Sequence, residues 1–120
     1  MRLRTPAVCG AALVVALASV SCSGANTTLC RNGDCTVGVG GTRHSGDLWE
    51  TRDIEYEFDI EVADDQSAEV TVTEEEDRRN RETDEEVTLR PGESAELFDY
   101  TVEYVSHDAT DGATFEFTRG

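Results

Sequence analysis

Apolar and acidic residues alternate strictly along residues 54–62. The apolar residues occupy the even positions, and Glu55, Glu57, Asp59 and Glu61 occupy the odd ones. A period of two residues is typical of a strand with one buried and one solvated face, whereas a helix would scatter the same residues around its axis. This stretch therefore predicts a long strand around which the rest of the chain is organised.

A second alternating segment follows after a short polar turn. Residues 64–67 read as the turn, and Ala68, Val70 and Val72 then alternate with polar residues. Because the apolar residues again recur every second position, the pattern predicts a half-buried strand. We expect this strand to be the hairpin partner of the long one.

A further hairpin is predicted around the Arg-Pro-Gly-Glu turn at residues 90–93. Proline presets one backbone angle of such a turn, and glycine can take a positive φ. A three-residue loop would place Leu89 opposite Ala95 and Val87 opposite Leu97, which keeps apolar residues on one face. We therefore expect the strands before and after the turn to pair.

The last third of the chain continues as strands and turns. Its apolar positions change from odd to even numbers near residues 98–99, which predicts a bulge or sharp bend there. A loop at residues 107–112 precedes a last strand around Phe115 and Phe117. With about seven strands and no helical pattern after the N-terminal segment, the fold class is all-β, a small antiparallel sandwich or partly open barrel.

Two polar stretches interrupt this pattern. Residues 42–53 read as a polar connection in which Trp49 closes one end of the core. Residues 74–86 contain no apolar side chain and thus have nothing to bury. We expect the second stretch to be a mobile loop or a projecting hairpin tip.

Two cysteines flank an Asn-Gly pair. Asn-Gly is typical of a two-residue hairpin turn, because both turn residues need positive φ. With Asn32 and Gly33 as the turn, Cys30 lies opposite Cys35 at the separation of a non-hydrogen-bonded pair, which allows a disulfide. The four intervening residues and the lack of a βαβ pattern favour a structural bond over a redox-active dithiol.

The N-terminus reads as an export signal over residues 1–21. Arg2 and Arg4 precede residues 7–20, which carry no charge and are too few to span a bilayer. A tether at residues 22–28 and a single β domain at residues 29–120 complete the expected organisation.

The site of signal cleavage has two interpretations. The residues Ser-Val-Ser-Cys that end at Cys22 resemble a bacterial lipobox, although the family usually has leucine where Ser19 stands. If Cys22 is lipidated and Cys9 is removed with the signal, Cys30 and Cys35 are the two cysteines that remain to pair. Ordinary cleavage before Ser19 would instead leave Cys22 as a free thiol in an oxidising compartment.

Charge narrows the classes of partner. The chain of 120 residues has a formal net charge of −16, and every basic side chain is an arginine. Such a surface is repelled by nucleic acid and by anionic headgroups, so we expect no nucleic-acid partner and membrane contact only through a lipid anchor. The acidity fits either a GC-rich genome with a strongly solvated surface or adaptation to high salt.

The sequence offers little catalytic chemistry. His44 and His107 fall in separate polar segments, and the familiar serine-hydrolase and zinc-protease motifs are missing. Carboxylates for a calcium site occur at residues 64–65, 74–77 and 108–111, without the spacing of an ordered calcium loop. We therefore expect no enzyme, no metal and no cofactor.

Three features together resemble small exported proteins of actinobacteria. They are the export signal ending at Cys22, the hairpin at residues 30–37 and the turn at residues 89–94. The resemblance implies a secreted or lipid-anchored β domain and implies no activity. The expected function is a non-catalytic, lipid-anchored extracytoplasmic β module that binds a protein or envelope partner; the alternative is an acidic, calcium-binding secreted protein.

Overall fold

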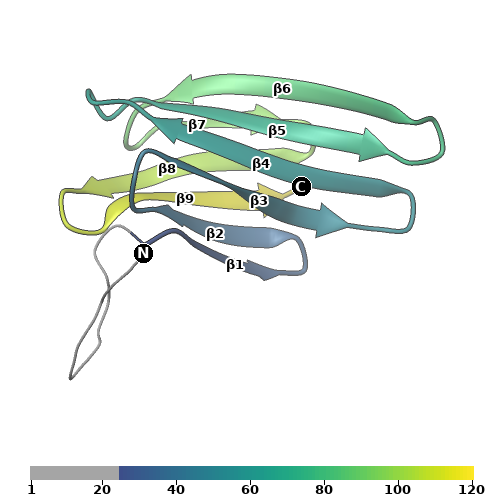
Figure 1. Cartoon of the computed structure of the whole chain (residues 1–120), viewed down its shortest axis with the longest axis horizontal. Coiled ribbons are helices and arrows are strands. Elements are labelled where there is room, and N and C mark those ends of the chain that lie inside the picture. Colours follow the sequence, from purple (N-terminus) through teal and green to yellow (C-terminus); the bar gives the residue numbers. More distant parts are fainter. Residues whose placement is uncertain (1–24) are drawn as a thin grey trace.

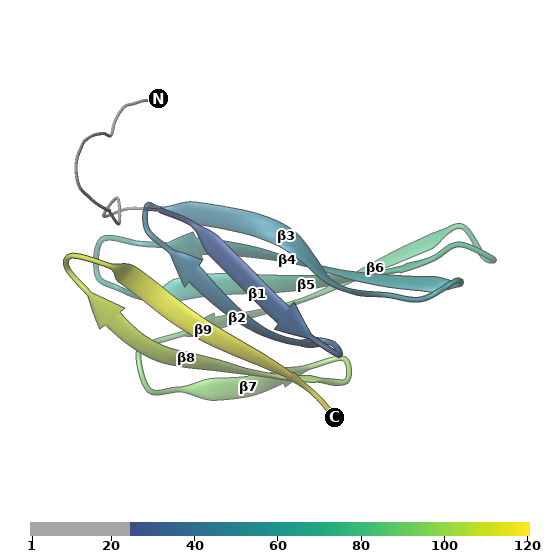
Figure 2. The same cartoon turned by 90° about the horizontal axis from the view of Figure 1, so that it is seen from below.

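Two antiparallel sheets pack face to face in a β-sandwich, as Figures 1 and 2 show. The computed structural model describes residues 25–120, and no helix occurs among them. Nothing in this described part could therefore cross a membrane as a helix. The strands are β1 (Thr27–Arg31), β2 (Asp34–Val39), β3 (Arg43–Glu50), β4 (Ile54–Val62), β5 (Ala68–Glu76), β6 (Arg81–Leu89), β7 (Ser94–Leu97), β8 (Tyr100–Asp108) and β9 (Gly112–Arg119).

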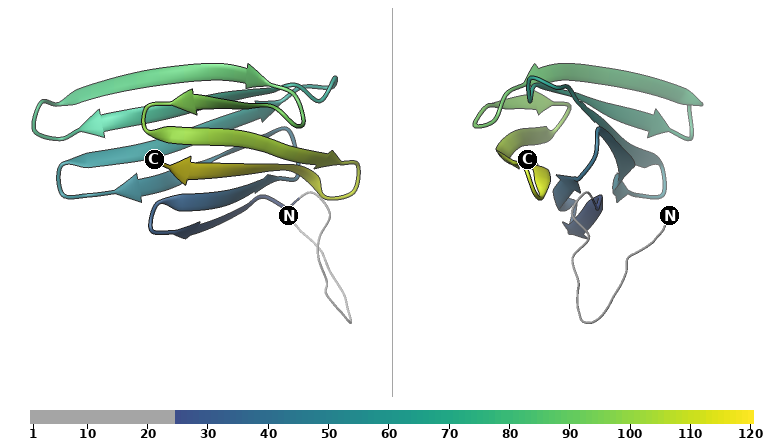
Figure 3. Two further views of the ribbon diagram at one scale, coloured as in Figure 1. Left: turned by 180° about the vertical axis from the view of Figure 1, so that it is seen from behind. Right: turned by 60° about the vertical axis from the view of Figure 1, so that its left-hand side comes forward.

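One sheet has the order β1-β2-β9-β8-β7 and the other has the order β3-β4-β5-β6. Figure 3 shows the two layers from behind and from the side. The predicted all-β sandwich is confirmed, whereas the described part has nine strands instead of about seven and does not close into a barrel.

The predicted long strand is β4, with the bounds that the alternation gave. Its even-numbered side chains from Tyr56 onward are buried and its odd-numbered carboxylates face outward. Phe58 and Ile60 are buried, and the ring of Phe58 packs against that of Phe117 in the opposite sheet, with 5.6 Å between their centroids. The core is completed by the inward residues of the other strands, among them Val37, Val39, Val70, Val72, Tyr100, Val102, Tyr104 and Phe115.

The cysteine hairpin has the predicted register. Arg31 pairs with Asp34 and Cys30 with Cys35, around a turn in which Asn32 and Gly33 have φ of 54° and 88°. The two cysteines form a disulfide with their Cα atoms 4.0 Å apart. The tether is shorter than expected, because residue 27 already belongs to β1, and the predicted signal and Cys22 lie outside the described residues.

The expected polar connection at residues 42–53 is wrong, since most of it forms β3. Its inward positions are His44, Gly46, Leu48 and, after the register shift, Trp49, so large apolar residues occur only toward its end. Gly46 lies under the ring of Phe58, where an added Cβ would come within 3.1 Å of a ring carbon. A glycine thus stands where an apolar residue would have completed the alternating pattern of a strand. Trp49 packs half-buried against the core, as expected.

The acidic segment at residues 74–86 is not a loop. It forms the paired ends of β5 and β6, which turn at residues 77–80 and project beyond the other sheet (Figure 2). The Asp77 N–H donates to the Asp53 carbonyl at 2.9 Å, so the turn is attached to the neighbouring β3–β4 turn. The projecting hairpin tip is confirmed, and backbone pairing holds it together without apolar side chains.

The predicted hairpin around residues 90–93 is also wrong. β6 pairs with β5, so that Leu89 faces Ala68, while β7 pairs with β8 in the other sheet, so that Ala95 faces Val102. Strands that line opposite walls of one interior show the same apolar period as hairpin partners, and the sequence pattern does not distinguish them.

The sharp bend expected near residues 98–99 is confirmed. Leu97 pairs with Tyr100 across a two-residue turn in which Phe98 has a φ of 55°. The following loop is shorter than residues 107–112, because β8 extends to Asp108 and β9 begins at Gly112.

Candidate functional site: an acidic sheet face

The outward positions of β3, β4, β5 and β6 form one continuous surface, which we call the acidic face. Cross-strand partners share a face of a sheet, so the register of the four strands defines its members. Carboxylates occupy most of them: Asp47, Glu50, Glu55, Glu57, Asp59, Glu61, Glu69, Glu75, Glu82, Asp84 and Glu86. The other members are one arginine, one serine and three threonines, namely Arg43, Ser45, Thr71, Thr73 and Thr88.

The charge is most concentrated near the β3–β4 and β5–β6 turns. There Glu50 pairs with Glu55, Glu55 with Glu75 and Glu75 with Glu82, so one row of four glutamates crosses the whole sheet. Like charges directly opposite one another destabilise a sheet. Repulsion within this glutamate row therefore lowers the stability of the folded domain.

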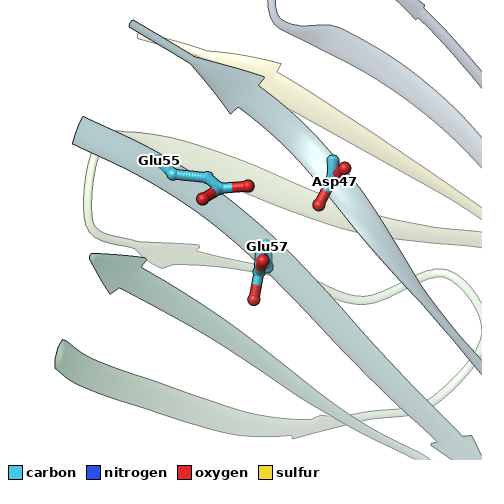
Figure 4. A group of neighbouring side chains, drawn as sticks. All are labelled: Asp47, Glu55 and Glu57. Atoms are coloured by element: carbon cyan, nitrogen blue, oxygen red, sulfur yellow. The ribbon is translucent and has the colours of Figure 1, made fainter. Parts of the chain in front are cut away.

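Three carboxylates come especially close beside the glutamate row. Asp47, Glu55 and Glu57 each place a carboxylate oxygen within 4.8 Å of the others (Figure 4). Asp47 pairs with Glu57 in the regular part of the β3–β4 ladder. The register shift that follows, between Asp47 and Trp49, then sets Glu50 opposite Glu55. Oxygen ligands at such spacing are the kind that calcium prefers.

The surroundings of these carboxylates favour their neutral forms. Desolvation, and then repulsion by Glu50 and Asp47, raises the pKa of Glu55 above its ordinary value. Desolvation, and then repulsion by Glu75 and Glu55, raises the pKa of Glu57 in the same direction. Both shifts mean that the folded protein holds these negative charges unfavourably.

The end of the acidic face near β1 is better compensated. Arg43 donates two hydrogen bonds to Asp59, from Nη2 to Oδ2 at 2.6 Å and from Nε to Oδ1 at 3.1 Å. That contact raises the pKa of Arg43, mainly through the hydrogen bond. On β5, Thr71 donates to Glu86 at 3.2 Å and Thr73 to Asp84 at 2.7 Å. Uncompensated charge therefore collects at the glutamate row.

The outer surface of the other sheet has a different character. Its outward positions on β2, β8 and β9 include Thr36, Thr101, Thr114 and Thr118, with Glu103 and Glu116 as its paired acids. Leu29 and Val105 are exposed on this sheet. The charge of the domain is thus unevenly shared between its two outer faces.

The glutamate row lies far from the start of β1 along the length of the sandwich. β1 begins at one end, and the β3–β4 and β5–β6 turns lie at the other, as Figures 1 and 2 both show. A tether attached before β1 would leave the glutamate row at the opposite end of the domain.

The predicted histidines are not brought together. His44 is on β3 and His107 is on β8, in different sheets. His44 Nε2 lies 2.8 Å from Thr28 Oγ1, and its ring meets the Phe58 ring edge-on at 5.3 Å between centroids. These contacts give His44 a packing role between β1 and β3.

Two of the three loop segments considered for the alternative of calcium binding have carboxylates that accept hydrogen bonds within their own turns. The Asp65 carboxylate accepts from the Ser67 hydroxyl at 2.6 Å and from its N–H at 3.0 Å, and these bonds lower the pKa of Asp65. The Asp108 carboxylate accepts from the N–H of Thr110 at 2.6 Å and of Asp111 at 3.2 Å, with the same effect on its pKa. Sequence reasoning missed Asp47, which only the unrecognised strand β3 places beside Glu55 and Glu57.

Comparison of the chain with protein-family models, curated proteins and solved structures gives no match.

Proposed function

We propose that the protein is a non-catalytic, lipid-anchored extracytoplasmic module whose acidic face binds a basic segment of a protein partner. The observation that carries the proposal is the glutamate row, four carboxylates paired across one sheet with no cation among them. A basic partner would supply the missing countercharge and relieve their repulsion. Complementary charge of this kind steers association and selects the partner.

The anchor follows from the N-terminal sequence. Residues 22–26 separate the proposed lipidated Cys22 from β1 and span at most roughly 17 Å when extended. A tether this short would hold the domain close to the membrane at the β1 end, with the glutamate row facing outward. The Cys30–Cys35 disulfide supports an oxidising compartment, where such bonds persist.

A charge-matched pair of variants tests the binding face. The triple variant E55Q/E75Q/E82Q neutralises three carboxylates of the glutamate row, and E96Q/E103Q/E116Q removes the same charge from the other sheet. Binding of a fluorescent Lys/Arg-rich peptide is measured by anisotropy at low and physiological salt. We expect the first variant to weaken binding about tenfold and the second to change it less than about twofold. Equal losses would reject the acidic face as the binding surface.

The anchor is tested separately by the intact mass of the protein from membrane and culture-fluid fractions. A membrane-bound species that begins at diacylated Cys22 supports the proposal. A soluble species that begins at Ser19 would contradict the anchor and leave Cys22 as a thiol.

A second candidate function is calcium binding at Asp47, Glu55 and Glu57, favoured by the approach of their oxygens to within 4.8 Å. On this proposal 1 mM calcium raises the melting temperature of the protein, and D47N removes the rise while E103Q keeps it. An unchanged melting temperature would eliminate this candidate.

A further inference from the structure

The two residues of the Cys30–Cys35 bond differ in their exposure to solvent. Cys30 lies on the edge strand β1 and is exposed, whereas Cys35 lies on the inner strand β2 and is 3% exposed. A reagent that approaches from solvent therefore meets the Cys30 sulfur first. Reactivity of a disulfide depends on which sulfur is attacked and on access to it.

A shallow surface groove of about 350 Å³ lies beside Cys30. Cys30 and Gly33 line one side of it, and Asp47, Trp49 and Glu50 line the other. The groove has room for a small thiol beside Cys30. It also places the single tryptophan of the chain next to the disulfide.

The fold accommodates the reduced form of the pair as well. The Asp47 carbonyl oxygen lies 3.8 Å from Cys30 Sγ, and the Leu48 carbonyl oxygen lies 3.5 Å from Cys35 Sγ. Each thiol would find an acceptor there for its weak S–H donor. The Asn-Gly turn and the β1–β2 ladder also hold the hairpin without the covalent bond.

We propose that the Cys30–Cys35 bond is a reversible thiol–disulfide exchange site, at which a small neutral or cationic thiol attacks Cys30 Sγ from the groove. The thiolate forms a mixed disulfide with Cys30, and Cys35 leaves as a thiolate that takes up a proton. A second thiolate attacks the sulfur of the bound thiol, and Cys30 is released and protonated. The two attacking thiols are oxidised to their disulfide, and the protein pair gains two electrons and two protons.

The charge of the groove decides which thiols react. Asp47 and Glu50 stand at its edge, and the glutamate row continues from Glu50 across the sheet. Arg119, whose guanidinium lies 4.5 Å from the centre of the Trp49 ring, is one positive charge against these acids. Local charge of one sign raises the concentration of oppositely charged reactants and lowers that of like-charged ones. The exchange site therefore selects against anionic thiols, and the selection weakens as salt screens the charges.

The first test compares cysteamine, which is cationic, with mercaptoacetate, which is anionic. It uses the full chain carrying C9S and C22S, so that one cysteine pair remains. Reduction is followed by iodoacetamide labelling with mass detection and by Trp49 fluorescence. Each rate is divided by the rate of the same thiol toward an unstructured Cys-Cys peptide disulfide, because the two thiols differ in thiolate fraction. We expect reduction without denaturant, with this relative rate about tenfold higher for cysteamine than for mercaptoacetate at low salt and the two relative rates converging in 1 M salt. A bond that is reduced only after unfolding, or equal relative rates at low salt, would overturn the proposal.

The second test asks which sulfur reacts. In the same background, C35S leaves the thiol of Cys30, and C30S leaves that of Cys35. We expect cystamine to trap a mixed disulfide on Cys30 at least about tenfold faster than on Cys35, because only Cys30 is exposed. Equal trapping, or preferential trapping on Cys35, would contradict attack at Cys30. The reduction rates of the first test remain decisive if either single variant fails to fold.

Discussion

Glu55 lies directly opposite Glu75 across the β4–β5 ladder, so two like charges share one cross-strand pair near the middle of a sheet. Glu50 and Glu82 extend the repulsion to both edges of that sheet. The fold tolerates this arrangement because the inward side chains of the same strands are the buried core. Burial of the inward side chains therefore offsets the free-energy cost of the repulsion between the outward charges.

Replacing Glu75 by threonine should stabilise the domain. The substitution removes repulsion toward Glu55 and Glu82 and continues the threonines that β5 already carries at residues 71 and 73. We expect a gain of about 0.5 kcal/mol in the free energy of unfolding, measured by urea denaturation at low salt.

The control for that variant is E96T, because Glu96 pairs with Thr101 and has no like charge opposite it. We expect E96T to leave the free energy of unfolding nearly unchanged. The gain from E75T should also shrink in 1 M salt, where the charges are screened. An equal gain from both variants would assign the effect to strand propensity instead of charge repulsion.

The stability of the domain should pass through a maximum in mildly acidic solution. The pKa values of Glu55 and Glu57 are raised in the fold, so protons bind the folded state more tightly than the unfolded state. Lowering the pH from 7 toward about 4.5 therefore relieves a penalty and increases stability. The pKa values of Asp65 and Asp108 are lowered in the fold, so their stabilisation is lost as the pH falls further, below about 3.8.

Thermal unfolding between pH 3 and pH 8 measures this profile. The variant E55Q/E57Q should flatten the rise between pH 7 and about 4.5, while E103Q should keep it. A melting temperature that falls steadily from pH 7 downward in the unmodified protein would contradict the prediction.

The strands predicted from the sequence are those with large apolar residues at every second position. β4 has that pattern along its whole length, and its bounds follow from it. β3 was not predicted because Gly46 and His44 occupy inward positions. The outer half of β6 was not predicted because it is held by backbone pairing alone. Strands with little to bury carry little periodic signal.

Only part of the candidate site could be predicted from the sequence, for a related reason. Alternation in β4 predicts that Glu55 and Glu57 share one face, but the partner of each depends on the register between strands. The register of β3 sets Asp47 opposite Glu57, and a one-residue change of that register would have removed Asp47 from that face. The bulge beyond Asp47 then sets Glu50 opposite Glu55. Registers and bulges are tertiary features, whereas the Cys30–Cys35 pairing follows from a local turn.

Tyr56 connects the core to the carboxylates that project beyond it. Its hydroxyl donates to Glu74 Oε2 at 2.6 Å, and desolvation together with this bond raises the pKa of Tyr56 above its ordinary value. Y56F should lower the free energy of unfolding by about 1–2 kcal/mol, because Glu74 is then left partly buried without its donor. Urea denaturation measures the loss.

The double variant Y56F/E74A isolates that interaction, because alanine leaves no acceptor for the Tyr56 hydroxyl. If the hydrogen bond is responsible, Y56F should cost less in the E74A background than in the unmodified protein. The same cost in both backgrounds would assign the loss to packing of the Tyr56 ring against Phe98 and Tyr100 instead.

Removing the disulfide should weaken the domain without unfolding it. The bond closes a short loop that the Asn32–Gly33 turn already forms, and the constraint it places on the unfolded chain is correspondingly small. We expect C30S/C35S to lower the free energy of unfolding by about 2 kcal/mol and to keep the circular dichroism spectrum of the oxidised protein. Amide hydrogen exchange should then rise in β1, the edge strand, before it rises in β9 at the centre of the same sheet. Uniform loss of protection throughout that sheet would show that the disulfide holds the whole sandwich together and not one strand.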